Sequence, residues 1–318
     1  MKTFLVRRLI GLIPVLFFIS VVVFALTRIL PGDPARLLAA IDESGVADPE
    51  VLAAITEKFG LDDPLHEQYL NWVKDVSRGN WGASIFSGQD IFPQIRDRLG
   101  FTVQLAGLAW LMSLLIGIPM GVISALKRNS AQDVAATSFA VSGVALPNFW
   151  LGMVLIIIFS VWLGWLPVGG YTPLSESPID WAKGMIMPVV TLGTALSAII
   201  MRQMRSGLLE VMGEDYVRTA RAKGAGPRRV IWIHAMKNAL IPVITVSTLQ
   251  LGTLMGGTVV TETVFFLPGL GRFIVDAVLS KDFLAIQMGL MVLTVGVLLA
   301  NLVADILYAV IDPRIRYT

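Results

Sequence analysis

Six long runs without a single charged residue dominate this chain of 318 residues. A helix of about 20 apolar residues crosses the ~30 Å hydrocarbon core of a bilayer, and five of the six runs suit one crossing each. Only 15% of the residues are charged, against ~25% in ordinary soluble domains, so polar material is too scarce to cover a soluble fold. The sequence therefore predicts an all-α integral membrane protein. The uncharged runs are 9–27, 99–126, 134–175, 184–201, 238–261 and 283–304.

The first run could be mistaken for a cleaved secretory signal. It follows the basic residues Lys2, Arg7 and Arg8 and stays uncharged from Leu9 to Thr27. A secretory apolar region is shorter, about 7–15 residues, and ends at a small-residue cleavage site. Because this run ends instead in a turn containing two prolines, we expect residues 1–30 to be a retained first transmembrane helix.

The third run is ambiguous, because its apolar part reaches Leu166 and Pro147 lies in its middle. It could form two short crossings or one long bent crossing. Basic residues lie near the start, in 127–133, in 202–237 and in the tail 312–318, and one crossing places all four on the same side. The positive-inside rule therefore favours one bent span and six crossings, with both termini in the cytoplasm. The expected spans after the first are 99–126, 134–166, 184–203, 238–262 and 283–311.

Residues 29–98 then face the opposite side, with twelve acidic residues against six Lys and Arg. Two amphipathic helical patterns occur here, one from Asp48-Pro49 to Gly60 and one from Asp63-Pro64 to Gly79. Proline at a helix start and glycine just past its end are the usual punctuation. We expect 31–98 to form a small helical, lid-like extracytoplasmic insertion, with a simple interfacial cap as the alternative.

The segment 204–237 separates the fourth and fifth spans and is rich in Lys and Arg. A short helix from about 215 to 223 would end at Gly224, which can adopt the left-handed conformation needed there. Pro227 can then begin a second helix that continues through Trp232. The small residues Ala220, Ala222 and Gly224 would let another protein approach the backbone closely. The pattern predicts an exposed docking elbow.

This segment resembles the cytoplasmic signature of binding-protein-dependent ABC importers, Glu-Ala-Ala-x-x-x-Gly. Gly224 matches the glycine and Ala220 the second alanine, whereas Arg218 and Thr219 replace the Glu and the first alanine. The family's Leu-Pro also lies elsewhere, since proline here comes at Pro242. The stretch 216–224, followed by His234 and Asn238 to Pro242, resembles the peptide-importing branch, in which these departures are normal.

Other segments extend this resemblance over essentially the whole chain. The chain resembles the first of the two permease subunits of dipeptide, oligopeptide or glutathione importers, and the expected fold is the type I importer permease with six transmembrane helices. The matching segments are Arg8 to Pro14, Leu30 to Pro34, Phe265 to Gly271 and Asp312 to Tyr317.

The resemblance implies a set of partners in a bacterial inner membrane. A second, homologous permease would share a central path, two cytoplasmic ATPase subunits would grip the elbow, and an external solute-binding protein would deliver cargo near 31–98. ATP and Mg would be bound by the ATPases, so no cofactor, metal or nucleic-acid partner is expected for this chain. The residues implied in ATPase coupling are Asp215, Tyr216, Arg218, Thr219, Ala220, Lys223, Gly224, Gly226 and Pro227.

The residues themselves argue against catalysis. The sequence contains no G-x-x-x-x-G-K-[ST] phosphate loop, so we expect a transport subunit without its own ATP-hydrolysing site. It also contains no cysteine, which excludes thiol catalysis and cysteine-ligated metals. His66 has no second histidine at helical spacing, so a metal site there is not favoured, and His234 is interpreted as structural.

Polar residues within the spans are candidates for lining a path. Asn148, Gln250 and Asn301 are such candidates, although hydrogen-bonded packing is the simpler interpretation. Glu262 and Asp305 are expected near the membrane boundaries, which leaves no clear charge at mid-depth. Two small-x-x-x-small patterns, 117–121 and 252–256, would allow close helix packing, either inside the chain or against a partner permease.

The cargo stays open at this point. Peptides are favoured by the resemblance, whereas related permeases carry nickel, opines or sugars. A gradient-driven carrier acting alone is a different class of function, and the lack of mid-membrane charge counts against it. A membrane-anchored receptor or enzyme built on 31–98 is a third, and no paired catalytic residues support it.

Overall fold

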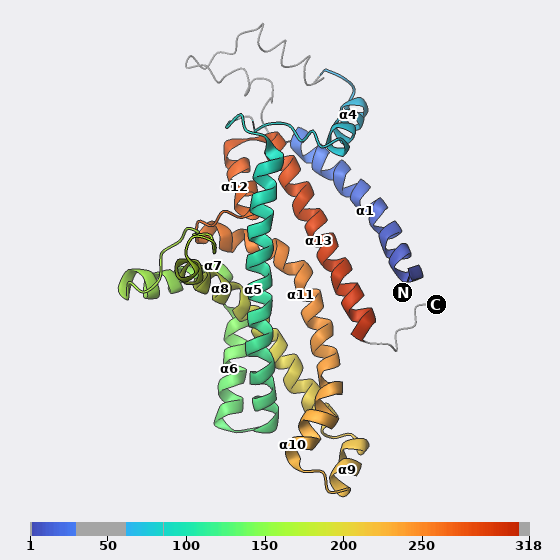
Figure 1. The fold of residues 1–318 in the computed structure, drawn as a ribbon, viewed down its shortest axis with the longest axis vertical. Helices are drawn as coiled ribbons and strands as arrows, with labels where there is room; N and C mark the ends of the chain where they lie inside the picture. Colours follow the sequence, from blue (N-terminus) through green and yellow to red (C-terminus); the bar gives the residue numbers. More distant parts are fainter. Residues whose placement is uncertain (1, 30–61, 85, 312–318) are drawn as a thin grey trace. The chain divides into compact units, whose positions relative to one another are not determined.

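The computed structural model describes residues 2–29, 62–84 and 86–311, and this part of the chain consists of helices joined by turns and loops, with one isolated bridge between Ala83 and Asp90 (Figure 1). The α-helices are α1 (Lys2–Ile29), α4 (Leu65–Ser77), α5 (Ile91–Leu126), α6 (Ala131–Ala145), α7 (Asn148–Leu155), α8 (Pro178–Val211), α9 (Asp215–Ala222), α10 (Pro227–Arg229), α11 (Met236–Val264), α12 (Leu270–Ser280) and α13 (Phe283–Ile311). Two π-helical segments, η1 (Ile156–Trp162) and η2 (Val230–Ala235), continue α7 and α10.

Among the described residues, five helices are long and apolar enough to cross a membrane, and α6 with α7–η1 makes a sixth span if the bent pair is counted once. The chain bends by 108° between these two arms. Leu146 and Pro147 adopt extended backbone there, so the proline ends α6 instead of merely kinking it. Each arm has 15 residues, ~22 Å of helix, and neither arm alone is long enough for a crossing. Two short crossings, one of the alternatives for this run, therefore do not fit.

Several helices extend beyond the predicted spans. α5 begins at Ile91 and includes Arg96 and Arg98, while α8 runs from Pro178 to Val211. These helices are longer than the uncharged runs, because those runs mark the apolar part of a helix and not its hydrogen-bonded ends. The helix α12 was not predicted at all, since its 11 residues lie between two spans.

The chain divides into two compact units. The first comprises Met1–Arg8, Gly100–Arg272 and Gly296–Thr318, and the second comprises Leu9–Leu99 and Phe273–Val295.

The core of the first unit is built around α5, α8 and α11. Glycine lets α5 approach α8 closely, because a Cβ on Gly117 would lie 2.7 Å from the Ser197 carbonyl oxygen and one on Gly121 would lie 2.5 Å from Met204 Cβ. The 117–121 pattern therefore packs inside the chain, one of its two predicted uses. One buried cluster lies around Leu105, Leu192 and Phe265, and a second around Val122, Met204 and Ala239.

In the second unit, α4 packs its aromatic residues on α1. The Tyr69 hydroxyl lies 2.7 Å from Ser20 Oγ, and the Tyr69 and Trp72 rings contact Phe24. α4 starts one residue after Pro64, and Gly79 has a φ of +82° just past its end, so the predicted helix and its stop are confirmed. The pattern predicted from Asp48 to Gly60, the turn after the first helix and the tail 312–318 lie outside the described residues.

Candidate functional site

The predicted elbow begins with α9, a two-turn helix whose side chains are mostly exposed. Val217 alone is fully buried within it, which anchors the helix while leaving its other faces open. The Thr219 hydroxyl donates to the Asp215 carbonyl oxygen over 2.9 Å, and Arg218 Nη1 donates to Asp215 Oδ1 over 3.3 Å. A small apolar contact and local polar contacts therefore hold a helix too short to be stable alone.

Gly224 ends this helix in a left-handed conformation with a φ of +83°. The Ala225 amide donates to the Ala220 carbonyl oxygen, and the Gly224 amide donates to the Arg221 carbonyl oxygen. This pair of hydrogen bonds is the pattern of a Schellman cap. A Cβ on Gly224 would meet nothing within 4 Å. The glycine is therefore required by the backbone conformation, and the surface above it is open.

After the glycine, the chain is helical from Pro227 onward and leads directly into α11. Pro227 opens α10, η2 follows, and α11 continues from Met236, which confirms the predicted second helix. Asn238 Nδ2 donates to the Tyr216 hydroxyl over 2.7 Å, so the first turn of α11 fastens α9. His234, expected to be structural, is half-buried within η2.

The elbow has a basic outer surface and an acidic groove beside it. The groove has a volume of about 440 Å³ and lies between the end of α8, α9 and the start of α11. Glu210, Glu214 and Tyr216 line it, with Pro242 on the α11 side. The exposed basic side chains of the elbow are Arg218, Arg221, Lys223, Arg228 and Arg229.

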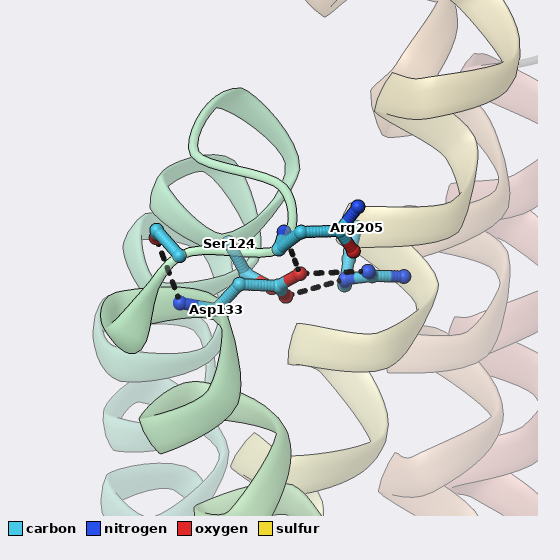
Figure 2. A network of polar contacts seen from close by, with 5 residues as sticks. Ser124, Asp133 and Arg205 are labelled. Carbon is cyan, nitrogen blue, oxygen red and sulfur yellow. Dashed lines mark hydrogen bonds and ion pairs between the residues drawn. The ribbon is translucent and has the colours of Figure 1, made fainter.

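A buried polar network that the sequence did not reveal lies where α8 approaches the elbow (Figure 2). Arg205 donates from Nε to Asp133 Oδ1 over 2.8 Å and from Nη2 to Asp133 Oδ2 over 3.0 Å. The Ser124 hydroxyl and the Asn129 amide donate to the same carboxylate. Four hydrogen bonds therefore join α5, the α5–α6 turn, α6 and α8 at one carboxylate. Sequence reasoning missed it because Arg205 was counted only as an inside positive charge.

Glu262 forms a second buried carboxylate node, at the other end of α5. It is 0% exposed; the Thr102 hydroxyl donates to Oε1 over 2.6 Å and the Arg272 amide to Oε2 over 3.1 Å. A Cβ on Gly269 or Gly271 would lie under 3 Å from the carboxyl group. Both glycines of the 265–271 motif therefore make room for this side chain.

The three candidate path residues have different surroundings. Gln250 is buried and donates from Nε2 to the Leu196 carbonyl over 3.4 Å, which joins α11 to α8. Asn301 packs on Gly252, whose Cβ would lie under 3 Å from its amide oxygen, so this second glycine pattern also serves internal packing at Gly252. Asn148 is half-exposed at the start of α7.

Two further polar residues contact charged neighbours at the surface. Asp305 Oδ2 lies 3.2 Å from Arg8 Nη1, which pairs α13 with the start of α1. His66 Nε2 lies 3.9 Å from Glu67 Oε1.

Comparison with known proteins gives a consistent result over the whole chain. The family described as binding-protein-dependent transport system inner membrane component matches residues 117–317, and the corresponding N-terminal family matches residues 1–106. The di/tripeptide transport system permease protein DppB of Pseudomonas aeruginosa is 41% identical, over 100% of this chain and 99% of its own length. The glutathione transport system permease protein GsiC of Escherichia coli K12 is also 41% identical, over 100% of both chains.

The fold has solved counterparts as well. The inward-facing MetNI methionine ABC transporter matches with a TM-score of 0.57 and 19% identity, over 70% of this chain and 97% of that chain. At this identity the likeness concerns the fold alone, and it confirms the expected type I importer permease fold.

Proposed function

Because this chain belongs to the binding-protein-dependent transport system inner membrane components, we propose that it is the permease subunit of an ATP-driven importer for peptide-like solutes. Full-length relatives at 41% identity, named for di/tripeptide and glutathione transport, support this cargo class. The same kind of permease carrying nickel, an opine or a sugar is the alternative cargo assignment.

The exposed elbow is the observation that carries the coupling role. α9 presents nearly its whole surface outward, a Schellman cap fixes its end, and the bond from Asn238 to Tyr216 fastens it to a membrane-spanning helix. A partner that grips α9 would therefore move α11 and α8 with it. In the proposed complex, two cytoplasmic ATPase subunits supply that grip, and this chain contributes the residues 215–227.

The remaining partners follow from the same assignment. A second, homologous permease would complete the path, and a solute-binding protein would deliver the cargo on the face opposite the elbow. With the elbow in the cytosol, six crossings place both termini there. The contact between Arg8 and Asp305, near the start of α1 and the end of α13, supports this arrangement.

Replacing Gly224 by Trp tests the coupling assignment. A side chain at φ +83° strains the Schellman cap, and the indole would occupy the open surface over which the ATPase would dock. We expect normal membrane insertion and at least a tenfold loss of ATP-dependent uptake in proteoliposomes that contain the whole importer. The matched control is Gly164→Trp, which has a φ of +64° and equally open surroundings away from α9.

Unchanged uptake by the Gly224→Trp importer would remove the coupling assignment. The cargo assignment is tested separately, by competition of labelled dipeptide uptake with unlabelled dipeptide, glutathione, nickel and sugar. Uptake that nickel or a sugar inhibits and that unlabelled dipeptide and glutathione do not inhibit would contradict peptides as the cargo class. Uptake by the purified chain without any ATPase would overturn the importer assignment itself.

A further inference from the structure

The ion pair between Asp133 and Arg205 lies near the end of α8, the helix that leads into the elbow. Arg205 lies on α8, six residues before the helix ends at Val211, so it is ~9 Å along the helix axis from the end of the helix that leads into the elbow. Asp133 is in the first turn of α6, directly after the turn that follows α5. The pair therefore connects the helix that leads into the elbow with the α5–α6 hairpin (Figure 2).

Packing alone already keeps these helices together. Ala136 and Ala140 of α6 pack on Ala198 and Met201 of α8, and Gly121 of α5 allows backbone contact with α8. An ion pair with a buried carboxylate adds little net stability over well-packed apolar side chains, because the Asp133 carboxylate leaves water almost completely and Arg205 does so in part. Its distinctive contribution is geometric, since a bidentate guanidinium–carboxylate pair fixes both distance and direction.

The Asp133 carboxylate holds more than one partner in that fixed geometry. The side chain is 6% exposed, and each of its two oxygens accepts one hydrogen bond from Arg205 and one from the α5–α6 side of the node. Asn129, which supplies one of these donors, has a φ of +63° in the turn. A displacement of Arg205 relative to the hairpin would break bonds at both oxygens at once.

We propose that Asp133 and Arg205 are positioning residues that make the α5–α6 hairpin and the end of α8 move as one body, so that motion of the elbow reaches the bent α6–α7 segment. This inference rests on the proposed function, because it concerns how an ATPase grip on the elbow is transmitted. Since α6 leads directly to the 108° bend, the hairpin is the shortest covalent route from the pair to that segment.

The test compares uptake with ATP hydrolysis in the reconstituted importer. We expect Asp133→Asn and Arg205→Lys each to lower the number of solute molecules imported per ATP hydrolysed by about tenfold, with assembly and basal hydrolysis retained. Loss of a purely structural contact would reduce assembled complex and both rates together. The matched control is Arg202→Lys, one turn earlier on α8 and exposed, which should keep the wild-type ratio.

A milder variant and a distance measurement cover the case in which the charge variants do not assemble. Ser124→Ala removes one of the four donors and should lower the ratio by about twofold. Spin labels on cysteines at the exposed positions 128 and 206 are simple to place because the chain has no native cysteine. The distance between the two labels should stay constant between nucleotide-free and ATP-bound states in the wild type. In Ser124→Ala the distribution of this distance should broaden.

Two results would overturn the inference. One is a wild-type ratio of uptake to hydrolysis in every assembled variant of the pair, and the other is a 128–206 separation that changes with nucleotide in the wild type. Failure of the wild-type importer to take up solute with ATP would instead contradict the proposed function, so the two failures are distinguishable.

Discussion

Two buried carboxylates, Asp133 and Glu262, organise the first unit at the level of single residues. Each accepts a hydrogen bond from one hydroxyl of α5, Ser124 for Asp133 and Thr102 for Glu262, and each also accepts from a backbone amide. Sequence reasoning placed Glu262 near a membrane boundary but assigned it no partner. Arg205, a partner of Asp133, and Thr102, a partner of Glu262, lie on helices distant in sequence, and a charge count carries no information about such contacts.

Gly269→Ala tests how closely the Glu262 carboxyl is enclosed. The added Cβ would lie under 3 Å from the carboxyl group of Glu262, so the side chain or the 265–271 turn must shift. We expect a loss of roughly 2–3 kcal/mol in stability, the size of an overpacked core site, measured by thermal unfolding in detergent. Gly107→Ala is the control, since a Cβ there meets nothing within 4 Å, and it should unfold no earlier than the wild type.

A double-mutant cycle between Thr102 and Glu262 measures their hydrogen bond. Both residues are fully buried, so Glu262→Gln places an amide where the Thr102 hydroxyl and the Arg272 amide both donate. We expect each of Thr102→Val and Glu262→Gln to destabilise the chain by about 1–3 kcal/mol, with a coupling of about 1 kcal/mol or more. Additive losses in thermal or denaturant unfolding would contradict a direct bond.

At the scale of helices, the elbow was the most predictable element. Its local signals agree, because Gly224 fits a left-handed cap and Pro227 fits a first helical position, and no tertiary contact overrides them. The ends of α5 and α8 were less predictable, since charged residues continue a helix as readily as apolar ones. The π-helical η1 and η2 were not predicted, because they depend on packing and not on a residue pattern.

The fastening of α9 to α11 gives a prediction for a whole element. Tyr216→Phe removes the hydroxyl that accepts from Asn238 and leaves the ring in place. Since one hydrogen bond contributes about 1 kcal/mol, we expect amide exchange in 217–224 to become about fivefold faster. Asn238→Ala should have a similar effect, and the double variant should add little. Exchange by mass spectrometry that stays at the wild-type rate in both single variants would mean that Val217 alone holds α9.

For the whole molecule, the separation of the two buried carboxylates along α5 is close to the expected thickness of the membrane. Thr102 and Ser124 are 22 residues apart on α5, ~33 Å along a straight helix, close to the ~30 Å hydrocarbon core. A buried charge is best tolerated near the ends of a span, where water and polar headgroups are close. The two carboxylates therefore join α5 to its neighbours at two positions about one hydrocarbon thickness apart.

The number of crossings then depends on the bent α6–α7 pair, which the positive-inside rule counts as one span. Single cysteines at the exposed positions 89, 128, 176 and 221 test this, because the chain has no cysteine of its own. A membrane-impermeant maleimide should label positions 89 and 176 in cells whose outer membrane is permeable, and positions 128 and 221 only after the inner membrane is opened. If the pair instead re-enters on the side where it starts, α8 runs in the opposite direction and positions 176 and 221 exchange sides. Labelling of 221 from outside would thus remove the elbow from the cytosol and, with it, the ATPase as its partner.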